Sequence, residues 1–279
     1  MRFMKYLVVI LLALAAFVAT MAYDNARADP VVRQLRLPLA DWPRGARPVR
    51  LLLASDIHIG SATMDGARLT RIVAQIDALR PDLIVLAGDF IEGNNVEEPA
   101  RVAPALIEAL RGLQAPLGVV AVLGNHDYST NAPDVLRSLR AAGITVLRNQ
   151  AVARGPLAIG GIDDDTGRHD NVQKTAQALA QLKGARILVA HSPDMARKLH
   201  RLQLAPASLL LAGHTHCGQI DLPFIGPPID VVSAHYRCGV VRDPGLTTLV
   251  TAGLGTSELP IRWNVPPDLW VVTLGPAAR

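Results

Sequence analysis

The chain has 279 residues, half of them hydrophobic, which is enough for one large buried core and excludes a disordered protein. Its formal charge of +4 is uneven, because residues 1–50 hold eight Lys or Arg and three Asp, whereas the rest hold 20 basic and 21 acidic residues. The chain from residue 51 onward is nearly neutral and the whole chain has eleven aromatic residues, so composition argues against a nucleic-acid partner, which typically needs a basic stripe with aromatic side chains.

The N-terminal segment, residues 1–28, is apolar and predicts export or membrane anchoring. Residues 6–23 carry no charge and follow Arg2 and Lys5. This length is near the short end for a transmembrane helix and exceeds the usual apolar core of a signal peptide. We expect a retained anchor, and the alternative is a cleaved signal segment because residues 26–28 resemble a small-x-small cleavage site. The N-terminal Lys and Arg favour that end staying inside, which places the remaining chain on the outer face of the cell inner membrane.

The rest of the chain predicts one domain of alternating strands and helices. Residues 29–48 contain four prolines and predict a linker that includes an edge strand, where proline is tolerated. The domain itself is predicted over residues 49–279. Apolar spacing, N-caps and proline stops predict helices, and β-branched runs predict strands. The predicted helices are residues 65–80, 96–113, 131–143 and 171–182, and the later strands are 144–147, 151–153, 157–162, 247–251 and 269–274. This order predicts an α/β fold with two sheets.

Five apolar runs each end in a tight turn that is rich in Asp, His or Asn. The runs are residues 51–55, 83–87, 117–122, 187–190 and 209–212. Each reads as a buried strand, and open α/β sheets bind ligands beyond the carboxyl ends of their strands. We therefore expect the polar side chains of these turns to converge on one site. They are Asp56, His58, Asp89, Asn125, His126, Asp127, His191, His214 and His216.

In order, these turns read Asp-x-His, Gly-Asp, Gly-Asn-His-Asp, His and Gly-His-x-His. This pattern resembles the calcineurin-like metallophosphoesterase superfamily over residues 55–219. The resemblance implies an α/β four-layer αββα sandwich of two mixed sheets flanked by helices, with two divalent metal ions at the sheet edges. Imidazole and carboxylate ligands suit Mn, Fe or Zn. The implied ligands of one ion are Asp56, His58, Asp89 and His216, and those of the other are Asp89, Asn125, His191 and His214.

The resemblance also implies a catalytic group. His126 matches the family's proton donor to the leaving oxygen, a role that suits histidine because its pKa lies near working pH. Glu92 occupies the position where many relatives have an Asp that supports this histidine. Asp127 is expected to support the site from behind the ligands, with helix capping or a solvated loop as the alternative.

Several other residues have weaker signals. The acidic run Asp163, Asp164 and Asp165 is interpreted as a solvated turn, because consecutive acids do not all face one ion. Arg237 and Arg262 are candidates to meet a substrate phosphate. Cys217 and Cys238 are the only cysteines, and in an exported protein we expect them to pair. The alternatives are an extra metal ligand beside His216 or two small buried residues.

Residues 213–223 and 253–267 resemble the envelope-associated bacterial YaeI/YkuE-like branch of the superfamily, which usually has Gly where Cys217 stands. The resemblance implies a phosphodiesterase or pyrophosphatase that acts on a lipid-linked or envelope substrate. Relatives include a UDP-2,3-diacylglucosamine hydrolase of lipid A synthesis, but an exported domain argues against that cytoplasmic substrate. The alternatives are a broad-specificity phosphatase for soluble phosphoesters and a non-catalytic, metal-stabilised binding module. The oligomeric state is not predicted.

Overall fold

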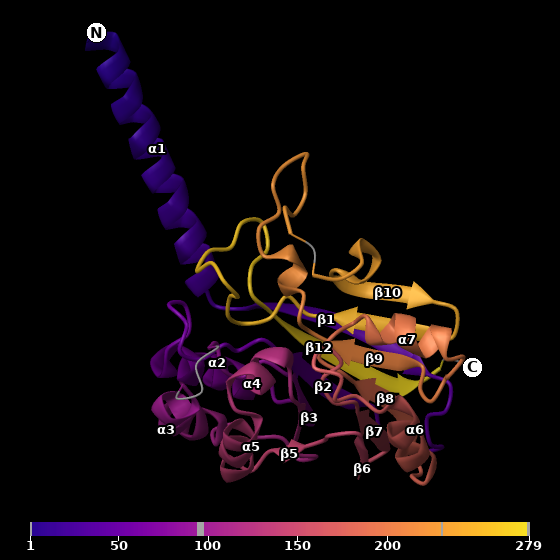
Figure 1. The fold of residues 1–279 in the computed structure, drawn as a ribbon. Coiled ribbons are helices and arrows are strands. Elements are labelled where there is room, and N and C mark those ends of the chain that lie inside the picture. Colours follow the sequence, from indigo (N-terminus) through magenta and orange to yellow (C-terminus); the bar gives the residue numbers. More distant parts are fainter. Residues whose placement is uncertain (1, 94–97, 230, 278–279) are drawn as a thin grey trace.

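The computed structural model describes residues 2–93, 98–229 and 231–277 as two packed sheets with helices outside them and one long projecting helix (Figure 1). The first sheet has six strands in the order β1-β12-β2-β3-β4-β5. It is mixed, because β12 and β2 are antiparallel and every other neighbouring pair is parallel. Its strands are β1 (Val31–Leu39), β2 (Val49–Ala54), β3 (Leu83–Ala87), β4 (Val119–Val122), β5 (Thr145–Val146) and β12 (Asp268–Pro276).

The second sheet also has six strands, in the order β10-β11-β9-β8-β7-β6. Its two outermost pairs are antiparallel and its central pairs are parallel. Its strands are β6 (Gln150–Arg154), β7 (Leu157–Gly161), β8 (Ala185–Val189), β9 (Leu209–Ala212), β10 (Gly239–Asp243) and β11 (Leu246–Val250).

The alternation of side chains along the strands creates three apolar layers. On β2, Leu52 packs under helices, whereas Leu51 and Leu53 face the second sheet. Helices α2, α3 and α5 cover the first sheet, and α6 and α7 cover the second. This confirms the predicted αββα sandwich. The helices of the sandwich are α2 (Gly66–Ala78), α3 (Glu98–Leu110), α4 (Asn125–Thr130), α5 (Ala132–Ala141), α6 (Val172–Ala180) and α7 (Met195–Arg201), with 3-10 turns at His216–Gly218 and Ala234–Tyr236.

Predicted helix boundaries hold where a cap defines them. Asp65 accepts a hydrogen bond from the Arg68 amide at the start of α2, and Asn131 caps α5 in the same way. The predicted start of α3 at residues 96–97 lies outside the described residues. Helix α4 is absent from the prediction because its six residues are polar and show no apolar periodicity.

Helix α1 (Arg2–Arg27) projects from the sandwich and is long and apolar enough over Phe3–Arg27 to cross a membrane (Figure 1). A signal sequence has the same properties. The C-terminal end of α1, however, is packed against the sandwich, where Ala22 and Ala26 are buried. The Arg262 amide donates to the Ala22 carbonyl at 2.9 Å. The base of α1 is therefore part of the folded domain.

The predicted disulfide between Cys217 and Cys238 is confirmed, with the two Cα atoms 4.8 Å apart. It joins the turn after β9 to the segment before β10. The bond therefore closes the loop of residues 217–238, which borders the site described next.

Candidate metal centre

The candidate site lies where the carboxyl ends of strands from both sheets meet. Strands β2, β3 and β4 of the first sheet and β8 and β9 of the second are each followed by site residues. The structure brings together the ten residues that the sequence singles out as ligands or catalytic groups. They are Asp56, His58, Asp89, Glu92, Asn125, His126, Asp127, His191, His214 and His216.

Five of these residues have backbones in the left-handed region, which is rare outside glycine. The φ angles are 51° for Asp56, 49° for His58, 54° for Asp89, 71° for His214 and 48° for His216. Each such conformation costs roughly 1–3 kcal/mol and persists only where the surroundings enforce it. Strain concentrated in the turns that supply the polar side chains is typical of a functional site.

Two glycines permit the close approach of these turns. A Cβ atom at Gly124 would lie 2.2 Å from Asp89 Oδ1, and one at Gly213 would lie 2.5 Å from Asp56 Oδ2. Both distances are far inside van der Waals contact. The Gly-Asn-His-Asp and Gly-His-x-His motifs therefore need their glycines to let carboxylates reach the neighbouring turn.

One half of the site is built around a pair of imidazoles. The Nε2 atoms of His58 and His216 lie 3.2 Å apart and both rings are buried. Asp89 Oδ2 lies 3.6 Å from His58 Nε2, and Asp56 Oδ1 lies 3.7 Å from His216 Nε2. Two carboxylates and two imidazole nitrogens thus face one small space.

The other half is built around His191. Its Nε2 atom lies 3.1 Å from each of three atoms, namely Asn125 Oδ1, His214 Nδ1 and Asp89 Oδ2. Asp89 Oδ2 is therefore near ring nitrogens of both halves. A single oxygen in this position suits a bridge between two cations.

The donor geometry fits a pair of metal ions. Two nitrogens that are each about 2.1 Å from one zinc ion lie about 3.0–3.4 Å apart if the N–Zn–N angle is between about 90° and 109°. The observed nitrogen pairs lie 3.2 and 3.1 Å apart. A hydrogen bond fixes the orientation of one ring, because His191 Nδ1 donates to the Ala87 carbonyl at 2.7 Å. His58 Nδ1 lies 3.1 Å from Glu92 Oε2, but the two atoms are not aligned as a hydrogen bond.

The electrostatics of the site also favour bound cations. Burial opposes charge on His191, but Asp89 and Asp56 outweigh it and raise its pKa to about 10. Burial and His191 lower the pKa of His214 to about 3, so its lone pair is free. Burial raises the pKa of Asp89, but His191 and His58 outweigh this and hold it well below its usual range. The carboxylates therefore attract positive charge, which a proton on His191 supplies or a metal ion that displaces this proton would supply, and the neutral imidazole of His214 could join as a ligand.

His126 faces the ligand cluster from α4. Its ring lies edge-on to that of His58, with the centroids 4.7 Å apart, and its amide donates to Asp89 Oδ1 at 2.9 Å. Its Nδ1 contacts the backbone carbonyl oxygen of Glu92 at 2.8 Å. Glu92 thus contacts His126 through its backbone and directs its carboxylate to His58, an arrangement that sequence spacing did not indicate.

Asp127 is fully buried behind the cluster. Its carboxylate accepts hydrogen bonds from the amides of Asp89, Phe90, Ile91 and Gly124 at 2.8–3.4 Å. Burial and Asp89 raise its pKa to about 7. The contacts tie the turn after β3 to the turn after β4, and the bond from the Gly124 amide is the capping contact at the start of α4.

Comparison with known proteins identifies the family. The calcineurin-like phosphoesterase superfamily domain matches residues 49–222. The uncharacterized metallophosphoesterase YkuE of Bacillus subtilis (strain 168) is 33% identical over 240 residues, which cover 83% of this chain and 81% of that protein. This chain belongs to the calcineurin-like phosphoesterase superfamily.

A second relative by sequence and one solved structure of similar fold are also informative. A Danio rerio transmembrane protein with metallophosphoesterase domain is 32% identical over 274 residues, covering 91% of this chain and 59% of that protein. The crystal structure of a dimetal phosphatase from Danio rerio is similar in fold, with a TM-score of 0.50 and 14% identity, covering 75% of this chain and 88% of that one.

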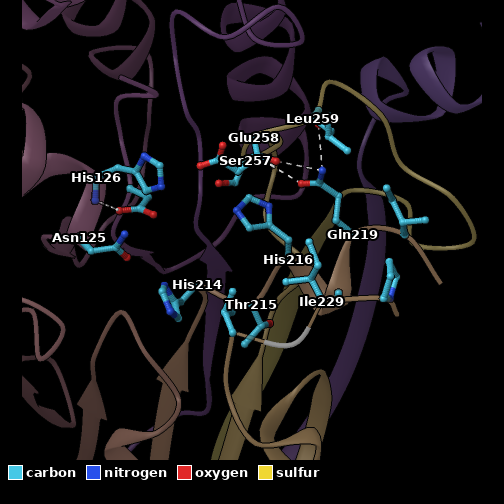
Figure 2. Close-up of a pocket in the computed structure, with 15 residues that line it drawn as sticks. Asn125, His126, His214, Thr215, His216, Gln219, Ile229, Ser257, Glu258 and Leu259 are labelled. Carbon is cyan, nitrogen blue, oxygen red and sulfur yellow. Dashed lines mark hydrogen bonds between the residues drawn. The ribbon is translucent and has the colours of Figure 1, made fainter. Parts of the chain in front are cut away.

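In this metallophosphoesterase the cluster opens into a cavity of about 300 Å³. Figure 2 shows Asn125, His126 and His214 at one end of it and Gln219 and Leu259 at the other. The outer wall exposes mostly apolar surface, although Gln219, Ser257 and Glu258 also line it. It includes Ile220, Pro228, Ile229, Val231 and Leu259. The cavity therefore combines a polar, metal-binding end with an apolar outer part.

Two predictions about other residues are wrong. Asp163 and Asp164 are buried rather than solvated, because Arg148 and Tyr128 from other segments bond to Asp163 and backbone amides bond to Asp164. Arg262 is fully buried and donates to backbone carbonyls, so it does not face a substrate. Its Nη2 lies 3.3 Å from His216 Nδ1, which places it beneath a candidate ligand.

Proposed function

We propose that this metallophosphoesterase hydrolyses a phosphodiester or pyrophosphate bond in a membrane lipid, using two divalent ions. Asp56, His58, Asp89 and His216 would hold one ion, and Asp89, Asn125, His191 and His214 the other. When bound, such a pair provides charge stabilisation and a nucleophile at neutral pH for displacement at phosphorus. The donor set is compatible with Mn, Fe or Zn.

His126 is the proposed general acid. Donation from its Nδ1–H to the Glu92 carbonyl, 2.8 Å away, leaves Nε2 as the atom that holds a proton for the leaving oxygen. The ring contacts the cluster through His58 but belongs to the cavity lining, where a substrate phosphorus would lie. Glu92 and Asp127 act by positioning His58 and the two turns.

The observation that carries the lipid proposal is the division of the cavity into a polar end and an apolar wall. A phosphate suits the polar end, because carboxylates and imidazoles there bind cations that in turn bind anions. The mostly apolar wall suits a hydrocarbon chain, whereas the polar groups of a soluble sugar or nucleotide would find only a few partners there, among them Ser257 and Glu258. A broad phosphatase for soluble esters would have no use for this wall.

The N-terminal helix supports a site beside a membrane. Because Ala22 and Ala26 are buried in the sandwich, cleavage after residue 28 would remove part of the folded core. We therefore propose a retained anchor with the domain on the extracytoplasmic face, where a disulfide is stable. The name of the Danio rerio relative, a transmembrane protein with metallophosphoesterase domain, is in keeping with an anchor.

Activity of the full chain in lipid nanodiscs with Mn²⁺ tests this proposal. We expect hydrolysis of a lipid phosphodiester or polyprenyl pyrophosphate in the nanodisc with higher kcat/KM than bis-p-nitrophenyl phosphate or p-nitrophenyl phosphate in solution. Equal or better turnover of the soluble esters would contradict the lipid substrate. Activity that survives complete chelation would contradict the two-metal mechanism itself.

The placement of α1 has its own test. Membrane pellets washed with high salt and then carbonate should retain the protein, because an apolar helix does not depend on charge to stay in the bilayer. Mature protein that begins at Asp29 in the soluble fraction would contradict the retained anchor.

A further inference from the structure

Exposed apolar side chains are concentrated beside the mouth of the cavity. Apart from α1, seven large hydrophobic residues are exposed among the described residues, and five of them lie in two loops at this mouth. These five are Phe224, Ile225, Ile229, Val231 and Leu259. Scattered exposed residues need no explanation, but a cluster of this kind marks an interaction surface.

The most exposed of them form the tip of a short hairpin, residues 219–229. The Leu222 amide donates to the Gly226 carbonyl at 3.2 Å, and the Gly226 amide donates back at 2.8 Å. Phe224 and Ile225 lie between these two residues and are almost fully exposed, with 77% of Ile225 accessible. Residues 222–229 contain no charged side chain.

Hydrogen bonds hold the base of the hairpin, whereas its tip is exposed to solvent. The Asp221 amide donates to the Trp263 carbonyl at 2.9 Å, and the Trp263 amide donates to the Gln219 carbonyl at 3.1 Å. The disulfide at Cys217 fixes the base of the same loop. A stable hairpin that presents Phe and Ile to the outside is therefore built into the fold.

Figure 1 shows this hairpin, drawn in orange, rising from the sandwich on the same side as α1. The base of α1 is bonded to the segment that braces the hairpin, because the Arg262 amide donates to Ala22 and the next residue, Trp263, pairs with the hairpin. The two projections are thus attached to one strip of chain, residues 262–263. A bilayer that holds α1 lies on the side to which the hairpin points.

We propose that Phe224 and Ile225 insert into the interface of the bilayer in which α1 is anchored, as a second attachment point that sets the cavity mouth against the lipid surface. Aromatic and aliphatic side chains gain from this transfer, and the uncharged run of residues 222–229 puts no charge into the interface. Pro228 and Ile229, at the end of the hairpin, line the cavity wall. An apolar path thus runs from the inserted tip to the metal centre.

This inference rests on the membrane placement proposed above, but its test does not depend on activity. Because no free cysteine is found among the described residues and the two in the chain are paired, Phe224→Cys provides a single thiol for a nitrobenzoxadiazole label. The matched control is Leu202→Cys, an exposed leucine at the end of α7 on another part of the sandwich. Both full-length variants are placed in vesicles that contain doxyl-labelled phosphatidylcholine.

We expect emission from the label at residue 224 to shift to the blue and to be quenched by the doxyl lipids at least threefold more than emission at residue 202. Equal quenching at the two positions would overturn the proposal. A label at residue 224 that is shielded from iodide but not quenched by lipid would also overturn it, in favour of a protein partner. If Phe224→Cys does not fold, Ile225→Cys at the neighbouring exposed position gives the same readout.

Hydrolysis provides a second, separable readout. The double variant Phe224→Asp, Ile225→Asp is expected to lower turnover of a lipid phosphodiester in vesicles about tenfold, by raising the apparent KM, and to leave turnover of soluble bis-p-nitrophenyl phosphate unchanged. Equal loss on both substrates would contradict an interfacial role. If the unmodified protein hydrolyses no lipid, the proposed substrate is wrong, while the quenching experiment still decides whether the hairpin enters the bilayer.

Discussion

Two groups of buried carboxylates follow strand ends in this molecule, and their surroundings differ. Asp56 and Asp89 follow β2 and β3, and their oxygens approach imidazole nitrogens within 3.1–3.7 Å. Asp163 and Asp164 follow β7, and their oxygens are taken by donors. All four carboxylates accept from protein N–H or O–H groups, but only Asp56 and Asp89 also share a space with several imidazole nitrogens that could act as further ligands of a cation.

Substitution of Asp89 is expected to have the largest effect. Asp89→Asn removes the charge that faces both halves of the cluster, so nearly all Mn²⁺-dependent activity and at least one bound metal ion should be lost. Hydrolysis of bis-p-nitrophenyl phosphate and the metal content per chain measure this. Asp163→Asn is the matched control and should keep both, since its partners are Tyr128 and Arg148. Full metal content in Asp89→Asn would break the distinction between the two groups.

Substitution of His126 distinguishes a role in proton transfer from a role in metal binding. We expect His126→Ala to lower kcat by about 10²–10⁴-fold, the usual contribution of a general acid, while the metal content stays the same. His169→Ala is the control, because His169 stacks on Tyr128 beside the second acidic group, with the ring centroids 3.8 Å apart. A fall in metal content that matches the fall in kcat would make His126 a ligand instead.

Asp163 should matter for stability. Asp163→Ala removes the acceptor that lies 2.7 Å from the Tyr128 hydroxyl and 2.9 Å from Arg148 Nε, and Arg148 Nε keeps only its contact with that hydroxyl. The free energy of unfolding should therefore fall by about 1–3 kcal/mol. Urea denaturation of the metal-loaded protein measures the change. Unchanged stability together with metal loss would mean that this group binds a cation.

Tyr128→Phe is expected to have the smallest effect on stability. It removes the hydroxyl, which donates to Asp163 and accepts from Arg148 Nε and Nη2 at 3.1 and 2.7 Å. Because the two contacts with Arg148 are exposed, we expect a loss of about 0.5–1.5 kcal/mol, the usual net contribution of one buried hydrogen bond. Arg148 still bonds to Asp163, which limits the effect. A loss as large as that of Asp163→Ala would show that the hydroxyl, and not the guanidinium, satisfies the carboxylate.

The sequence predicts the fold class and the members of the cluster because each turn directly follows a buried strand. Parallel strands bring such turns to one edge, so local patterns at Asp56, Asp89 and His191 are enough to place them together. The disulfide was predictable because only two cysteines exist. Long-range contacts were not predictable from these patterns.

Asp163 and Glu92 show why local patterns do not predict long-range contacts. An acidic run resembles a solvated turn until Arg148 and Tyr128, both from other segments, are placed beside it. Likewise, the resemblance to the family implies that Glu92 lies near His126, but it does not show that the carboxylate turns toward His58. The packing of Ala22 against the sandwich has no local signal at all.

The buried last turn of α1 decides where a water-soluble form of this protein can begin. A chain that starts at Asp29 exposes the surface that Ala22 and Ala26 cover and deprives the Arg262 amide of its acceptor. Arg262 is the residue whose guanidinium lies beneath His216. A chain that starts at Met21 keeps these contacts and omits most of the apolar helix, so it is the better starting point for crystallisation.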